Sequence, residues 1–479
     1  MNYFSSQNPL KSTLLFSVFS LLQFGVSIVL VPIFLNYLTP EDYGVISLVL
    51  IYATIVATLS SFGLKSALYT FYFDFDTKVK RHNYLKNIFS AHVLSFIVLG
   101  IIHLFLGNQI FNLVFISNEI SFFYYGCIAL LSNFFALLNS LYFIYLKNEI
   151  NLKSYFKYTF STTILTAFLQ LFFIVICKLE IYSILLGTLI PHIIIFVFIT
   201  FHNPFLLSFR LEKELIYPSL KYGIKLLPFL LFFALENQID RYLIEINFGL
   251  KQVGLYAVII KLFSLVTITL NALDDGIRPF MFNDLKHTKT TANHYFNLYL
   301  GFGIFAVVVV TSMGYNLQYI IVNTAYLELK SYLFYGAIVF LLLIPIRFYA
   351  LLLVFYKDSS KLSYLTCLKV LFMIVLMTVL IPEYQLYGVF YALVLSNLIN
   401  IIVFALILRK KLLLHLRLLT IIYGSLFIIG SYILHQQLNT TNELISSIIY
   451  LIVFTSLFLL IYFKSSYDLL KTGFQNKLE

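Results

Sequence analysis

The stretch ENQIDRYLIEINFGLKQVGLYAV, from Glu236 to Val258, places four charges within ten residues of an otherwise apolar segment. These charges are Glu236, Asp240, Arg241 and Glu245, and Leu, Ile, Phe and Val dominate the sequence around them. A soluble helix would carry its charges on one wet face, whereas these flanks are apolar all round. The stretch therefore predicts a membrane helix with ionisable groups inside it, each of which costs free energy.

The composition of the whole chain also indicates a membrane protein. Of its 479 residues, 61% are hydrophobic and only 11% are charged, and the mean hydropathy is +0.92. Soluble domains are about 45–50% apolar and about 25% charged. A transmembrane barrel is disfavoured, because its strands would alternate apolar and polar residues.

Fourteen segments are long and apolar enough to cross a bilayer, which takes about 20 residues of helix. The predicted spans cover residues 12–37, 42–64, 84–107, 120–146, 155–177, 181–202, 219–247, 252–281, 293–314, 330–355, 359–381, 385–408, 415–435 and 443–463. Their connections are short, and none is long enough to hold a soluble catalytic domain. We expect an all-α polytopic membrane protein with about 14 transmembrane helices.

The basic residues set the expected orientation, because short cytoplasmic loops are enriched in Lys and Arg. With the N-terminus inside, the outer loops hold only Lys178, Lys251 and Lys330. The other loop cations, including Lys65 and Lys147, then fall on the inner side. Both termini are expected in the cytoplasm. These loops account for the net charge of +11, so we expect no nucleic-acid partner.

A repeat with an offset of 210 residues relates the two halves of the chain. EDYGVISLV, at the start of the second span, matches KQVGLYAVI, at the start of the eighth, with Gly44 and Gly254 in register. FYFD and MFND, which end at Asp74 and Asp284, keep the same offset. The offset covers six helices, so both copies have the same orientation, as in some transporter folds. Chance similarity between apolar helices is the alternative.

The repeat predicts two six-helix lobes followed by two further helices. The expected boundaries are an N-lobe over residues 1–210 with spans 1 to 6, and a C-lobe over residues 211–411 with spans 7 to 12. Residues 412–479 would then hold spans 13 and 14 and a cytoplasmic tail.

The deep charges all fall in the predicted spans 7, 8, 10 and 11. A charge at the centre of a spanning helix costs roughly 2.5–3.5 kcal/mol, so these groups must be paired or hydrated. We expect four cations to line a water-filled cavity between the lobes, which would attract an anionic substrate. They are Arg241, Lys261, Arg347 and Lys369.

Two acidic residues are candidates for ion coupling. Glu236 and Asp240 are four residues apart, on one face of a continuous helix, and could exchange a proton or a sodium ion. A structural interpretation stays open beside this one. In it, Asp240 pairs with Lys261, or Arg241 pairs with Glu245, and the pairs lock helices together.

Motifs for catalysis and metal binding are absent from the sequence. There is no Gly-rich phosphate loop ending in GK[ST], no HExxH and no G-x-S-x-G. Cys127, Cys177 and Cys367 are far apart and have no metal-ligand spacing. We therefore expect neither an enzyme nor a cofactor or metal site.

Two stretches resemble bacterial polysaccharide flippases. LVPIFLNYLTPEDYGVISLV, from Leu30 to Val49, resembles the hairpin of spans 1 and 2 in that family, and IDRYLIEINFGLKQVGLYAV followed by IRPFMFND resembles the signature of spans 7 and 8. These Wzx-type O-antigen flippases belong to the multidrug/oligosaccharidyl-lipid/polysaccharide exporter superfamily, which has a MATE-like fold. Asp240, Arg241 and Gly254 match the family by motif position.

The resemblance implies a substrate and a mechanism. The substrate would be an oligosaccharide repeat unit on undecaprenyl pyrophosphate, moved from the inner to the outer leaflet of the bacterial cytoplasmic membrane. The mechanism would be alternating access without ATP, with basic cavity residues meeting the pyrophosphate. The product would serve O-antigen, capsule or exopolysaccharide assembly, and the partners would be membrane lipids and other polysaccharide assembly proteins.

Three other functions are weighed against the flippase. A MATE-type cation-coupled drug exporter would call for acidic residues deep in the N-lobe, where the sequence has neutral polar groups such as Gln23, Asn133 and Gln170. A polymerase or lipid-carrier ligase would be expected to have a large outer loop with catalytic Arg and His. A membrane scaffold would leave the intramembrane charges unexplained.

Overall fold

The regular structure of the chain is helical throughout the part that can be described. The computed structural model describes residues 25–26, 29–115, 120–149, 151–207, 209–236, 238–287, 291–316, 323–356 and 358–409, and these ranges contain no strand. Eleven helical segments among them are long and apolar enough to cross a membrane. They correspond in chain order to predicted spans 2 to 12. The all-α polytopic fold is therefore confirmed, while spans 13 and 14 and most of span 1 lie outside the described residues.

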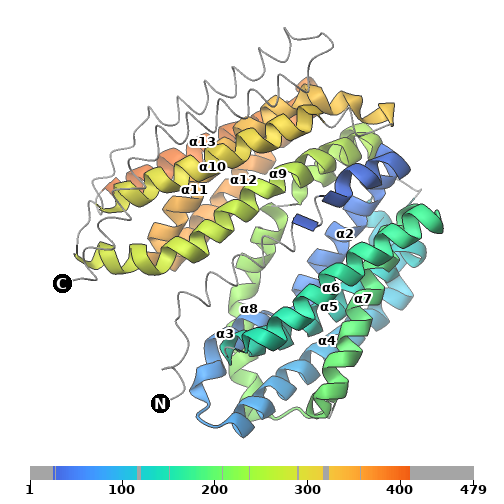
Figure 1. Ribbon diagram of the computed structural model, residues 1–479, viewed down its shortest axis with the longest axis vertical. Coiled ribbons are helices and arrows are strands. Elements are labelled where there is room, and N and C mark those ends of the chain that lie inside the picture. The colour runs from blue at the N-terminus through green and yellow to red at the C-terminus, as the bar shows by residue number, and fades with distance from the viewer. Residues whose placement is uncertain are drawn as a thin grey trace. The chain divides into compact units, whose positions relative to one another are not determined.

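The described helices fall into two compact units, which are treated separately. The N-terminal unit runs from Tyr37 to Ala257. Within it, α5 and α6 both pack against α7, and α2 packs against α5 and α8 (Figure 1). Its helices are α2 (Pro40–Ser61), α3 (Leu64–Phe71), α4 (Lys78–Val114), α5 (Cys127–Asn148), α6 (Leu152–Leu171), α7 (Ile181–His202), α8 (Lys213–Glu236) and the first part of α9 (Ile239–His287).

The C-terminal unit comprises Met1–Asn36 and Val258–Glu479, of which the described part from Val258 ends at Arg409. It holds the rest of α9, α10 (Thr291–Asn316), α11 (Lys330–Phe355), α12 (Ser359–Tyr384) and α13 (Leu386–Arg409). Within this unit α11 packs against α10 and α13, and α12 packs against α13 (Figure 1). Stacked aromatic rings join α9 to α11, with the centroids of Phe263 and Phe340 5.2 Å apart.

The start of α2 follows from its own residues. Thr39 accepts a hydrogen bond from the Asp42 backbone N–H at 3.1 Å, and the Asp42 carboxylate accepts one from the Thr39 backbone N–H at 2.9 Å. This reciprocal capping box, with Pro40 at the first helical position, satisfies backbone donors that a helix N-terminus leaves without partners. It fixes the helix start in the middle of the stretch from Leu30 to Val49 that resembles the flippases.

The helix α2 ends at Ser61, and after a break of two residues α3 begins at Leu64. Phe62 and Gly63 adopt left-handed backbone conformations, with φ of 43° and 69°. A Cβ atom on Gly63 would lie 2.6 Å from the Cα atom of Gly223, so the two backbones touch at this point. The predicted span over residues 42–64 thus continues past the break as a short helix against α8.

The predicted helix over residues 219–247 is wrong in its detail. The helix α8 includes both Pro218 and Pro228 and ends at Glu236, eleven residues before the predicted end of the span. Proline's fixed φ of about −65° is itself helical, so a helix can accommodate it at the loss of one hydrogen bond. The next helix, α9, begins at Ile239. The single helical face assumed for Glu236 and Asp240 therefore does not exist.

The glycines of the 210-residue repeat meet each other within the N-terminal unit. A Cβ atom on Gly44 would lie 2.3 Å from the carbonyl oxygen of Leu250, and a Cβ atom on Gly254 would lie 1.7 Å from that of Pro40. Each built atom also comes within 3.3 Å of the other glycine's backbone nitrogen. Two helices can approach this closely only where neither carries a side chain. The repeat thus marks the crossing of α2 and α9.

Substitution of Gly254 by Ala should destabilise the protein, because the new methyl group has no space at this crossing. Overpacking of this kind costs about 1–3 kcal/mol, and thermal unfolding in detergent micelles would measure it. Gly100→Ala is the matched control, since a Cβ atom there meets no other atom within 4 Å and Ala is favoured over Gly in a helix by roughly 0.5–1 kcal/mol. Equal melting temperatures for wild type and Gly254→Ala would contradict the crossing.

Candidate functional site

The carboxylate of Asp240 links the two arms of a helical hairpin. The chain turns at Gly249, whose φ of 76° and ψ of −173° interrupt α9. Asp240 lies on the arm before this turn and Tyr256 on the arm after it, and the Tyr256 hydroxyl donates a hydrogen bond to Asp240 Oδ2. Asp240 Oδ1 accepts from the backbone N–H of Arg241 at 2.8 Å. Both oxygens are therefore used inside the protein.

The pair is deeply buried. Asp240 is 6% exposed and Tyr256 is fully buried. A hydrogen-bonded carboxylate in such a place holds its helices in one register, because separating the arms would leave it without its phenolic donor. The structural interpretation paired Asp240 with Lys261, whereas the structure gives the carboxylate Tyr256 as its hydrogen-bond partner.

Arg241 lies beside this pair but takes other partners. Its guanidinium donates to the side-chain oxygen of Gln238, and it is close enough to Tyr43 on α2 to interact with it electrostatically. The side chain is half-buried, and Glu245, one turn further along, is 4% exposed. Arg241 is therefore held at the start of α9 by groups from its own turn and from α2.

The other predicted cations belong to the C-terminal unit. Lys261 on α9 and Arg347 on α11 are half-buried, and Lys369 on α12 is 9% exposed. Arg241 belongs to the N-terminal unit, so the four cations come from both units. The cavity that they are expected to share stays a prediction.

A buried phenol lies near charged groups of two other helices. Tyr299, on α10, interacts electrostatically with Asp274 and Arg278 of α9 and with Arg347 of α11.

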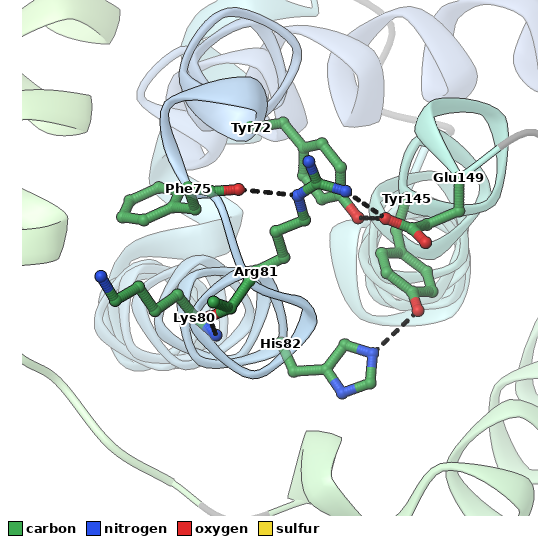
Figure 2. A network of polar contacts seen from close by, with 8 residues as sticks. Tyr72, Phe75, Lys80, Arg81, His82, Tyr145 and Glu149 are labelled. Carbon is green, nitrogen blue, oxygen red and sulfur yellow. Dashed lines mark hydrogen bonds and ion pairs between the residues drawn. The ribbon is translucent and has the colours of Figure 1, made fainter. Parts of the chain in front are cut away.

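A second polar cluster joins the end of α3 to the end of α5 (Figure 2). Glu149 Oε1 accepts from the Tyr72 hydroxyl at 2.6 Å and from Arg81 Nη1 at 3.0 Å. Arg81 Nε also donates to the carbonyl oxygen of Phe75 at 2.8 Å. Burial and the hydrogen bond to Glu149 raise the pKa of Tyr72 well above its usual range, so its phenol stays a donor. We call Tyr72, Arg81 and Glu149 the clamp.

Sequence reasoning missed the phenol partner of Asp240 and the clamp. Residues 240 and 256 lie at nearly equal distances from Gly249, and a hairpin folded at that glycine brings them together. Among the described residues, no group of three His, Cys, Asp or Glu could hold a metal ion.

Comparisons with known proteins agree with this architecture. Residues 36–274 match the model of a family described as "Polysaccharide biosynthesis protein". No curated protein sequence matches the chain. A solved structure of the lipid II flippase MurJ, in an inward closed conformation, superposes with a TM-score of 0.71 at 13% identity, covering 93% of this chain and 98% of that one.

Drug exporters and a related transporter share the fold too. An inward-facing multidrug resistance MATE family transporter of the MOP superfamily gives a TM-score of 0.61 at 13% identity, with coverage of 88% and 96%. A MOP superfamily transporter from Pyrococcus furiosus, whose title reports a binding pocket of reverse polarity, gives 0.55 at 16% identity, with coverage of 85% and 96%. At these identities the likeness shows the fold alone.

The helices, the intramembrane charges and the shared fold define a multi-pass membrane protein with a MATE-like fold. The family match then makes the identification more particular. Residues 36–274 belong to the polysaccharide biosynthesis family, which confirms the resemblance seen in the sequence.

Removal of the phenolic donor should weaken the hairpin. Tyr256→Phe keeps the ring but leaves Asp240 Oδ2 without its donor, and an unsatisfied buried group costs about 1–3 kcal/mol. We expect a lower free energy of unfolding in detergent, measured by denaturant titration. Tyr124→Phe is the control, because Tyr124 is 65% exposed in the same unit. If both variants unfold like the wild type, the Asp240–Tyr256 bond contributes nothing to stability.

Proposed function

We propose that this protein is a flippase for oligosaccharide repeat units carried on undecaprenyl pyrophosphate. It moves them from the inner to the outer leaflet of the bacterial cytoplasmic membrane by alternating access. The observation that carries the proposal is the polysaccharide-family match over residues 36–274 on a fold shared with a structure titled as a lipid II flippase. The activity makes and breaks no covalent bond, so no catalytic residue is assigned.

The intramembrane cations fit an anionic passenger. Lys369 is 9% exposed on an apolar helix, and Arg241, Lys261 and Arg347 are half-buried. A lipid-linked diphosphate would compensate such charges while it passes, and basic groups in a low-dielectric site attract it strongly. We therefore assign these four residues to the substrate path, where they contact the diphosphate and any acidic sugar.

The setting follows from the same proposal. Both termini lie in the cytoplasm, as the distribution of loop cations favours, and the product feeds the assembly of O-antigen, capsule or exopolysaccharide. The partners are the lipid-linked oligosaccharide, the surrounding membrane lipids and other polysaccharide assembly proteins.

Transport of a lipid-linked oligosaccharide would test the proposal. Proteoliposomes holding a fluorescent undecaprenyl pyrophosphate oligosaccharide in both leaflets would be quenched from outside, and wild-type protein should make the inner pool accessible. Lys369→Gln and Arg347→Gln should each slow the exchange at least tenfold, because each loses a charge-assisted contact of about 1.5–3 kcal/mol. Lys213→Gln is the control, since Lys213 is exposed at the start of α8.

The outcome separates the two transporter functions. Exchange of the oligosaccharide lipid by wild-type protein, and its loss in the two cavity variants alone, would establish the flippase. A chain that leaves the lipid in place but exports cationic dyes would be a drug exporter, and the proposal would be wrong.

Ion coupling by Glu236 and Asp240 is a separate part of the proposal. The double variant Glu236→Gln, Asp240→Asn removes both titratable groups, so transport should lose its dependence on an imposed proton or sodium gradient. The same vesicles, with and without the gradient, would measure this. Glu214→Gln, at an exposed position on α8, should keep the wild-type response. Full gradient dependence in the double variant would end the coupling proposal.

A further inference from the structure

A row of buried polar side chains on α4 holds the connection between α7 and α8. Tyr84, Asn87 and Ser90 follow one another at intervals of three residues, so each lies next to the following one on the helix surface. They are 1%, 0% and 3% exposed. We call these three residues the seam. Because a polar group buried at this depth is costly without a hydrogen bond, each member of the seam needs a partner.

Two members of the seam bind the backbone of the connection. The Arg210 N–H donates to Ser90 Oγ at 3.1 Å. The Glu212 N–H donates to Asn87 Oδ1. Asn87 Nδ2 donates to the Asn83 carbonyl oxygen of its own helix at 2.9 Å, which turns Oδ1 toward the connection. The side chains of Arg210 and Glu212 pair with each other at 2.8 Å, so it is the backbone of these residues that α4 binds.

The third member of the seam extends these contacts to α3 and α8. The Tyr84 hydroxyl donates to the Ala67 carbonyl oxygen of α3 at 3.2 Å and lies 2.8 Å from Ser219 Oγ of α8. Ser219 is itself 1% exposed. One turn further along α8, a Cβ atom on Gly223 would lie 2.0 Å from the Phe62 carbonyl oxygen. The helix α8 thus packs closely against α2, α3 and α4, which all belong to the N-terminal unit.

The seam coincides with the boundary that the repeat predicts between the lobes. That boundary falls after residue 210, and the seam binds the backbone at residues 210 and 212. A hinge needs residues whose dihedral angles can change while few bonds break. A turn at this connection would separate two N–H donors from their acceptors and leave Asn87 Oδ1 and Ser90 Oγ buried without partners. The connection is therefore built as a fixed segment.

We propose that α8 moves with the N-terminal unit during transport, and that Asn87 and Ser90 are the positioning residues that hold it there. This inference rests on the proposed function, because it assumes alternating access, and it makes that mechanism more particular. The part of the chain that turns between the two moving bodies then lies beyond α8. The first span of the second repeat is carried by the first body, so the moving bodies do not follow the repeat.

Hydrogen–deuterium exchange on the full-length protein in nanodiscs would test the seam without a transport assay. The two amides that the seam binds should be protected in the wild type. Ser90→Ala and Asn87→Ala each remove one acceptor and should speed exchange of the peptide that contains these amides about tenfold. Ser95→Ala is the matched control and should exchange there like the wild type, because Ser95 of α4 donates to the Ser60 carbonyl oxygen of α2. Melting temperatures would verify that each variant is folded.

A cross-link between α3 and α8 would test whether α8 moves. Thr70 Oγ1 donates to the Tyr222 hydroxyl at 3.3 Å, and both side chains are exposed. Thr70→Cys and Tyr222→Cys, in a chain whose three native cysteines are replaced by Ser, would be joined by a short bis-maleimide. The linked protein should flip the fluorescent undecaprenyl pyrophosphate oligosaccharide as fast as the unlinked one. Each single-cysteine variant treated with the reagent controls for modification alone.

Each result decides between the inference and the function beneath it. Unprotected amides in the wild type, or exchange unchanged by both seam variants, would overturn the inference whatever the protein transports. A cross-link that does not form, or one that stops transport by an otherwise active protein, would also overturn it and leave the flippase proposal standing. A wild-type protein that fails to flip the oligosaccharide lipid but keeps its seam-dependent protection would refute the flippase and retain the fastening of α8.

Discussion

The crossing of α2 and α9 at Gly44 and Gly254 is the contact on which the N-terminal unit depends. A built Cβ atom on Gly254 would fall 1.7 Å from the Pro40 carbonyl oxygen, so the helices touch through their backbones. The neighbouring features follow from that approach. The capping box of Thr39 and Asp42 starts α2 one turn before Gly44, and Tyr256, two residues past Gly254, reaches Asp240 across the hairpin. Helix packing between apolar surfaces alone would allow these elements to slide, and the glycines and the buried hydrogen bond prevent it.

The sequence was a good guide to the spans, because the bilayer imposes one length on every crossing. Predicted boundaries such as 181–202 and 330–355 coincide with α7 and α11. It was a poor guide inside a span. The break between Glu236 and Ile239 has no glycine or proline, while Pro228, a residue type that often breaks a helix, lies within α8. Whether a helix passes through a proline depends on its neighbours, and a single sequence does not contain them.

In the candidate site, the sequence likewise identified the unusual charges but not the residues that they contact. Depth in a span identified Asp240, Arg241 and Arg347 as unusual, since their cost depends on the residue and its place in the bilayer. Their partners depend on folding. Tyr256 and Gln238 come from a hairpin and a helix start, so the pattern of charges along the chain could not supply them.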